Sequence, residues 1–189
     1  MMSERSLRIV VTGGPGSGKT SLVEHYRLAG HAIVPEAALQ IIQELTRTMG
    51  MAPQRRWRQE RVVEFQRLIL QRQLELERHN GSAIHGWVFL DRGRPDGLAY
   101  MHLARVTPPE DMVAMMADDP YDRVFVLDTL DEYNPRTATG RFTESREDSL
   151  LIQQAILRVY RELGYQPVPV PVMPLAARAA WIKRMLPPP

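Results

Sequence analysis

The sequence contains no cysteine, and this absence excludes two kinds of stabilising chemistry. Disulfide bridges cannot form, and thiolates cannot hold zinc or an iron–sulfur cluster. No run of apolar residues approaches the roughly 20 that a membrane-crossing helix needs. The first residues, MMSERSLRIVV, are too short and too polar for a secretory signal peptide. We therefore expect a cytoplasmic protein without a membrane segment.

A strong excess of charge of one sign is also missing. The 24 lysines and arginines nearly balance the 22 acidic residues, which gives a net charge of +2. This charge is too balanced to argue, by itself, for nucleic acid as a partner. Only two of the basic residues, Lys19 and Lys183, are lysines. Nearly all the positive charge lies on arginine, whose planar guanidinium binds carboxylates and phosphates in a fork-like geometry.

The length of 189 residues fits one domain over residues 1–189. Short apolar runs predict five strands, over residues 7–12, 31–34, 86–90, 123–127 and 166–172. Helical patterns separate them, over residues 18–29, 35–49, 54–79, 95–105, 109–117, 144–163 and 175–186. This alternation predicts an α/β three-layer sandwich, with a five-stranded, mostly parallel sheet and helices on both faces. In such sheets ligands bind at the carboxyl ends of the strands.

The fifth predicted strand carries prolines at every second position, at Pro167, Pro169 and Pro171. Residues two apart point their backbone N–H groups toward the same neighbouring strand. The three missing donors therefore fall on one side, and only an edge strand tolerates that loss. We expect this strand to lie at one edge of the sheet.

The segment between the first strand and the first helix matches the phosphate-binding P-loop, G-x-x-x-x-G-K-[ST]. Its glycines allow backbone N–H groups to converge on a polyphosphate, and the following helix adds the positive end of its dipole. In this motif Lys19 reaches the β- and γ-phosphates and the Thr20 hydroxyl binds Mg²⁺. The cofactors expected are therefore ATP and Mg²⁺. The nucleotide-binding residues expected are Gly13, Gly14, Pro15, Gly16, Ser17, Gly18, Lys19, Thr20 and Ser21.

Two predicted strands end in an aspartate, as expected of a residue that organises Mg²⁺: WVFLD at Asp91 and VFVLD at Asp128. Asp91 continues as Asp91-Arg92-Gly93, and Glu36 follows the second strand. This arrangement resembles thymidylate kinases and deoxynucleoside kinases. The resemblance implies that Asp91 organises Mg²⁺ and the acceptor, that Arg92 contacts the acceptor and that Glu36 accepts a proton from its hydroxyl. Simpler roles are a helix cap for Asp91 and a dipole-complementing first-turn residue for Glu36.

The polar segment 129–146 contains three arginines at a spacing of five, Arg136, Arg141 and Arg146. It resembles the arginine-bearing lid of these kinases, which closes over the phosphates and excludes water. The resemblance implies that Arg136 binds the nucleotide and that Arg141 stabilises the transferring phosphoryl group. A solvated loop with scattered charge is the alternative, and the spacing does not divide the roles among the three.

Taken together, GGPGSGKT, VPEAA, LDRG, RTATGRFT and LGYQPVPVP resemble a family of small AAA-type ATP-binding proteins. That family includes the nicotinamide-riboside kinase domain of bifunctional NAD regulators. The resemblance covers nearly the whole chain. It implies transfer of the ATP γ-phosphate to a small nucleoside-, nucleotide- or vitamin-like acceptor, which the sequence does not identify.

Two other functions compete with the kinase hypothesis. A P-loop ATPase or NTPase switch would use hydrolysis to act on a partner. A nucleic-acid binder would use the arginine-rich stretch 55–78, but four glutamates dilute the charge of that stretch, so this partner is not expected. On the same stretch Phe65, Gln66, Arg67 and Gln71 could line an acceptor pocket, although core packing or surface exposure is the simpler expectation. The sequence does not determine the oligomeric state.

Overall fold

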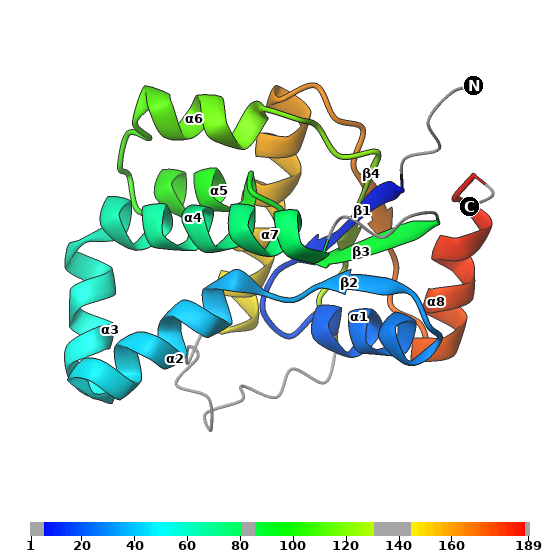
Figure 1. Cartoon of the computed structure of the whole chain (residues 1–189), viewed down its shortest axis with the longest axis horizontal. Helices are drawn as coiled ribbons and strands as arrows, with labels where there is room; N and C mark the ends of the chain where they lie inside the picture. The colour runs from blue at the N-terminus through cyan, green and yellow to red at the C-terminus, as the bar shows by residue number, and fades with distance from the viewer. Residues whose placement is uncertain (1–5, 81–85, 131–144, 188–189) are drawn as a thin grey trace.

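The computed structural model describes residues 6–80, 86–130 and 145–187, and its centre is a five-stranded sheet (Figure 1). The strands lie in the order β2-β3-β1-β4-β5, and every pairing is parallel. Their bounds are β1 (Leu7–Gly13), β2 (Ala32–Val34), β3 (Trp87–Asp91), β4 (Arg123–Leu127) and β5 (Val168–Val170). The predicted α/β architecture is therefore confirmed.

Helices cover both faces of this sheet, as Figure 1 shows. The helices are α1 (Lys19–Leu28), α2 (Ala37–Met49), α3 (Met51–Glu60), α4 (Val62–Asn80), α5 (Asp96–Leu103), α6 (Glu110–Ala117), α7 (Arg146–Glu162) and α8 (Leu175–Arg184). Helices α1 and α8 lie on one face, and α4 to α7 lie on the other. Among the described residues, no helix is both long enough and apolar enough to cross a membrane.

The core consists of two apolar layers that share the strands, because successive strand residues point to opposite faces. Val10 and Leu90 belong to the layer under α4 to α7. Ile9 and Phe89 belong to the layer over α1 and α8, where the Phe89 ring stacks on Tyr26 with 3.7 Å between ring centroids. Strands buried on both faces explain why the sequence shows continuous apolar runs rather than alternation.

The prediction of one helix over residues 54–79 is wrong, because the structure has two helices that meet at Arg61. Pro53 lies in the first turn of α3, where backbone N–H groups make no intrahelical hydrogen bond. The helix can therefore include this proline and start before it. Arg61 leaves the helical conformation, with φ −125° and ψ 56°. The bend brings Trp57 and Phe65 into one apolar cluster with α2. The burial of this cluster stabilises the bend.

Strand β5 lies at the edge of the sheet, as the alternating prolines predict. It is shorter than expected, with three residues. The Val170 carbonyl accepts from the Asp128 N–H at 2.9 Å. The backbone N–H and C=O groups of the valines therefore point toward β4, and the backbone carbonyls of the prolines point away from it. The outward carbonyl of Pro171 accepts a hydrogen bond from Arg178 Nε at 3.1 Å. This edge is therefore blunted on its outer side.

Replacing Phe89 with alanine should lower the free energy of unfolding by about 3–5 kcal/mol, because the ring is fully buried and a cavity would remain. Urea denaturation measures the change. Leu28→Ala is the matched control, since its side chain is 73% exposed and its loss should cost less than ~0.5 kcal/mol. Equal losses in the two variants would contradict the assigned core.

Candidate functional site

The P-loop joins the carboxyl end of β1 to the first turn of α1. Gly16 and Gly18 have φ of 72° and 83°, in the left-handed region that residues with a Cβ rarely adopt. The Lys19 side chain folds back over the loop, and its Nζ donates to the Gly14 carbonyl at 2.7 Å and to Ser17 Oγ at 3.2 Å. The lysine is thus placed at the centre of the loop that the motif predicts.

Two neighbouring helices hold the P-loop in place. From α7, Ser149 Oγ donates to the Pro15 carbonyl at 2.6 Å. A Cβ on Gly14 would lie 2.3 Å from the Ser149 carbonyl oxygen, so only glycine fits there. From α8, the buried Arg178 donates through Nη1 to the Ser17 carbonyl at 2.7 Å. The loop conformation therefore depends on residues that the motif does not contain.

Asp91 at the end of β3 meets Thr20 at the start of α1. Thr20 Oγ1 donates to Asp91 Oδ2 at 2.9 Å. The other oxygen, Oδ1, is buried and has no hydrogen-bond partner among the described residues. Burial, and secondarily the charge of Glu36, raises the pKa of the Asp91 carboxyl to about 6. Asp128, the second strand-ending aspartate, instead accepts from Gln153 Nε2 at 2.7 Å, away from this hydroxyl.

The pair formed by Asp91 and Thr20 fits a magnesium ion. Its donors are a carboxylate oxygen without a partner and a hydroxyl, both of which are hard oxygen ligands. Such an ion keeps several water or phosphate ligands, so few protein groups are needed. Among the described residues, no group of three or more histidine, cysteine or acidic side chains could hold a metal ion.

Lys19 shares its buried surroundings with the charges of Arg92, Asp91 and Glu36. Burial is the largest influence on its amine and, together with the charge of Arg92, lowers the pKa to about 7, whereas the acidic groups act in the opposite direction. Without a bound anion, the neighbouring groups therefore balance the positive charge of this lysine only in part. A phosphate group beside it would favour the charged form.

Arg92 connects the acidic residues around the loop. Its Nε lies 3.2 Å from Glu36 Oε1, and its Nη1 lies 3.0 Å from Asp96 Oδ2. Its backbone has φ 79°, an uncommon conformation for a residue with a side chain. Asp96 in turn accepts from Thr12 Oγ1 at 2.6 Å and from the Tyr160 hydroxyl at 2.9 Å. These contacts hold the strained arginine in one position.

Glu36 is the N-cap residue of α2, but its side chain makes no capping hydrogen bond to that helix. It is buried and faces Arg92. The structure therefore directs this carboxylate toward the P-loop cluster rather than toward the end of its own helix.

A cavity of about 300 Å³ opens beside the P-loop and extends under α4 and α5. Its polar end includes Lys19, Thr20, Glu36 and Arg92. Its apolar end is formed by helices, with Ile42, Phe65, Ile69, Leu70, Tyr100 and Met116 on its walls. Ser21, Pro15, Gly16 and Gly18 also line the cavity. Its size suits a small molecule rather than a macromolecule.

Helix α4 contributes the face that carries Phe65, Gln66 and Gln73 to this cavity. Arg67 and Gln71 do not line it, because they lie on another face of the helix, where Arg67 pairs with Asp111 at 2.5 Å. Gln73 and Arg178 are not singled out by any sequence motif. The only sequence signal for Gln73 is its spacing of seven from Gln66, two helical turns along the same face.

The predicted lid lies mostly outside the described residues, and so do Arg136 and Arg141. At its two ends, Leu130 lines the cavity and Arg146 begins α7. Helix α7 starts with a capping box, in which Ser145 Oγ accepts from the Asp148 N–H at 3.1 Å.

Comparison with known proteins identifies the family of the chain. A family described as an AAA domain matches residues 8–178. The chain belongs to this family. No match was found among curated protein sequences.

Solved structures share the fold of this AAA-domain chain. The NadR protein in complex with NR superposes with a TM-score of 0.63 and 18% identity, over 87% of this chain and 43% of that chain. NadR in complex with NAD and AMP-PNP gives 0.63 and 17%, over 96% and 50%. Thymidylate kinase from Candida albicans gives 0.56 and 11%, over 96% and 91%. The chain spans half or less of the NadR chains it matches, and it shares the fold of these three structures.

The lowered pKa of Lys19 predicts a rise in stability with pH. Between about pH 7 and 10.5 the unfolded chain keeps a proton that the folded protein releases, so the free energy of unfolding should increase across this range. Urea denaturation in nucleotide-free buffer with a chelator, at pH 7 and pH 9.5, measures the increase. Lys19→Met should remove this part of the slope, and an identical slope in both proteins would contradict the prediction.

Proposed function

We propose that this protein is an ATP-dependent kinase that transfers the γ-phosphate of ATP to a hydroxyl or phosphate of a small nucleoside-, nucleotide- or vitamin-like acceptor. The observation that carries the proposal is one continuous cavity with two unlike ends. One end is bounded by the P-loop, and the other is a chamber lined largely by apolar side chains of the helices; together they enclose about 300 Å³. A protein that only hydrolyses ATP has no need of that second chamber.

The P-loop end would bind the triphosphate. Backbone N–H groups of the loop and of the first turn of α1 have no intrahelical partners and would point at the phosphates. Lys19 Nζ, which here donates to Gly14 and Ser17, would transfer its hydrogen bonds to the β- and γ-phosphates. The phosphate charge would also compensate the lysine charge, which burial disfavours in the free protein.

Thr20 and Asp91 would hold Mg²⁺ on the same side of the loop. When bound, the ion bridges phosphate oxygens and neutralises charge that develops during transfer. The unpartnered Oδ1 of Asp91 gives this proposal its structural support.

Glu36 and Arg92 would meet the acceptor between the two ends of the cavity. Their ion pair fixes the direction of both side chains. In this position Glu36 would accept the proton of the acceptor hydroxyl, and Arg92 would contact the acceptor or its phosphate. Asp91 lies beside them and would help to orient the acceptor. The arginines of segment 129–146, Arg136 and Arg141 among them, would complete the phosphate contacts.

Screening nucleosides, nucleotides and vitamins with ATP labelled at the γ-phosphate tests the proposal directly. We expect at least one acceptor to receive the label, and slow hydrolysis without acceptor because water is a poorly positioned substitute. Brisk hydrolysis that no compound in the panel stimulates would favour the NTPase alternative.

Lys19→Ala should abolish tight ATP binding and turnover while the domain stays folded. The side chain contacts the loop and not the apolar core, so its removal affects the phosphate site first. Calorimetric titration with ATP and Mg²⁺ measures the loss, and circular dichroism verifies folding. Unchanged affinity and turnover would overturn the P-loop assignment.

Asp91→Asn should lower transfer to the acceptor by at least about a hundredfold, as expected when a charged group acts on the reacting atoms. ATP should still bind through the P-loop. Asp128→Asn is the matched control, because this aspartate also ends a central strand but contacts Gln153. The rate of phosphoryl transfer in both variants decides the question, and equal rates would remove Asp91 from the proposed site.

A further inference from the structure

The apolar end of the cavity contains a buried amide whose orientation the protein itself fixes. Gln73 of α4 lines the cavity and is only 3% exposed. Its Nε2 donates to Glu77 Oε1 at 3.0 Å and lies 3.5 Å from the Arg92 carbonyl oxygen. Both amide hydrogens are thus directed at protein acceptors. The carbonyl oxygen, Oε1, accepts no hydrogen bond from the described residues.

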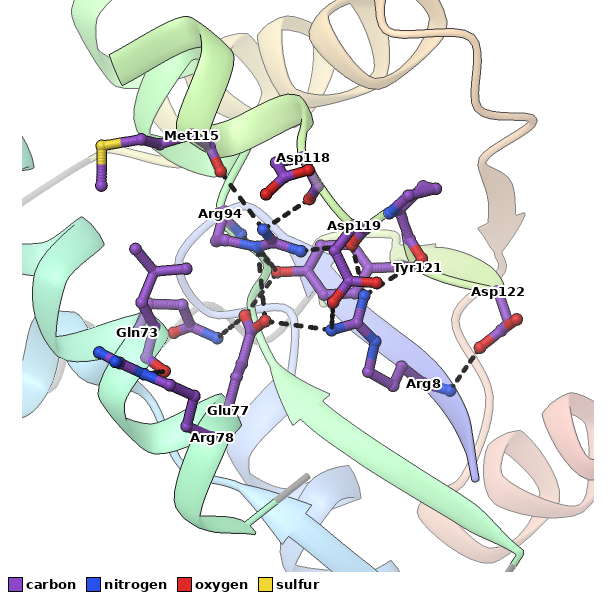
Figure 2. A network of polar contacts seen from close by, with 12 residues as sticks. Arg8, Gln73, Glu77, Arg78, Arg94, Met115, Asp118, Asp119, Tyr121 and Asp122 are labelled. Carbon is purple, nitrogen blue, oxygen red and sulfur yellow. Dashed lines mark hydrogen bonds and ion pairs between the residues drawn. The ribbon is translucent and has the colours of Figure 1, made fainter. Parts of the chain in front are cut away.

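The orientation of an amide follows from what its neighbour can donate or accept, and Glu77 can only accept here. Two guanidinium groups face its Oε2: Arg94 Nε at 3.4 Å and Arg8 Nη1 at 3.6 Å. Both arginines form ion pairs with this carboxylate, and a carboxylate accepts hydrogen bonds without donating any. Figure 2 shows this arrangement, with Glu77 between the two arginines and the amide of Gln73.

Tyr121 removes the remaining ambiguity at Glu77. Its hydroxyl accepts from the backbone N–H and from Nε of Arg94, each at 3.0 Å. Its single hydrogen must therefore go to Glu77 Oε1, which lies 2.6 Å away. Burial, and then the Glu77 charge, raises the pKa of this hydroxyl, so it keeps its proton. Glu77 Oε1 therefore accepts one hydrogen from Tyr121 and has none to donate. Gln73 must turn its NH₂ group, and not its carbonyl oxygen, toward it.

The network is itself anchored in the fold. Arg94 donates to the carbonyls of Asp118 and Asp119 at 2.6 Å each and to that of Met115 at 3.3 Å, at the end of α6 (Figure 2). Arg94 and Glu77 are almost fully buried, with side chains 2% and 6% exposed. Most polar groups of this buried network are paired, although Arg8 Nε has no hydrogen-bond partner among the described residues. Such a network favours one geometry, because a rearrangement would leave further buried polar groups without partners.

We propose that Glu77 is a positioning residue for acceptor specificity: it holds the Gln73 amide with its carbonyl oxygen toward the cavity, which then selects acceptors that present an N–H donor to that wall. The proposal rests on the proposed function, since it concerns the acceptor end of the same cavity. The chemical class it favours is a flat heterocycle with an exocyclic amino group. Phe65 and Tyr100 would contact its faces, while a carbonyl in place of the amino group would meet Gln73 Oε1 and be rejected.

Pairs of compounds in which the exocyclic amino group is replaced by a carbonyl, with the adjacent ring nitrogen changing from acceptor to donor, provide the test. Cytidine and uridine form one pair, and adenosine and inosine form another; the first member of each carries an amino group where the second carries a carbonyl. Binding to the full chain, measured by calorimetry in the presence of a nonhydrolysable ATP analogue and Mg²⁺, should favour an amino member over its partner by at least tenfold. Transfer of label from ATP is measured separately on the same compounds.

Two variants and one control identify the residues responsible. Gln73→Leu should abolish the preference, because the carbonyl oxygen is lost. Glu77→Gln should reduce it, because a glutamine can donate as well as accept and so releases the Gln73 amide to rotate. Gln71→Leu makes the same chemical change on the exposed face of α4 and should leave the preference unchanged. Glu77→Gln also removes a counter-charge of two arginines, so Gln73→Leu, which keeps that charge, is the decisive variant if Glu77→Gln unfolds.

The outcomes separate this inference from the proposed function. A preference for the carbonyl members, no binding by either pair, or an amino preference that survives Gln73→Leu would overturn the inference. An amino preference without any phosphoryl transfer would support the inference and overturn the kinase proposal. Phosphoryl transfer without an amino preference would support the kinase proposal and overturn the inference. A purely structural role for Glu77 would change stability but would leave the ratio of affinities within each pair unaltered.

Discussion

The burial of charged side chains at the carboxyl ends of β1 and β3 is the constraint on which the rest of the site depends. Lys19, Asp91, Glu36, Arg92 and Asp96 lie together, and the side chains around them exclude most of the solvent. Isolated charges at such depth are costly, so each must be compensated by another charge or a hydrogen bond. The compensation is incomplete at Lys19 and at Asp91, where burial shifts both pKa values toward the neutral forms. Those two residues are the ones to which a phosphate and a metal ion would supply the missing partners.

The surrounding helices fix this cluster in space at some conformational cost. Arg92 adopts a left-handed backbone conformation and is held there by Glu36 and Asp96. Gly93 beside it has no room for a side chain, since a Cβ would lie 2.4 Å from the Tyr160 hydroxyl. Strain of this kind persists only where neighbours leave no alternative, and it concentrates at functional sites. At Gly14, α7 likewise approaches the P-loop so closely that a side chain would not fit.

A second buried network, around Glu77, reaches the cavity lining through Gln73 and Arg94. It joins β1, α4, the loop after β3 and the segment that follows α6, through Arg8, Glu77, Arg94 and Tyr121. Arg92 and Arg94 are two residues apart, and each anchors one of the networks. Gln73 contacts both, through the Arg92 carbonyl and the Glu77 carboxylate. The polar and apolar ends of the cavity are therefore mechanically connected through the turn that follows β3.

The sequence by itself determined the succession of strands and helices along the chain, except within residues 54–79. It also determined the edge position of β5, the P-loop and the two candidate aspartates at strand ends. Those features are local, because they depend on apolar periodicity, on proline chemistry and on residues adjacent in the chain. The tertiary structure decided that Asp91 and not Asp128 meets Thr20, that α3 and α4 separate at Arg61, and that Gln73, Glu77 and Arg178 matter. Each of these depends on which elements pack together. A buried face of a helix has the same pattern in sequence whether it contacts the core or a cavity, and only packing distinguishes the two.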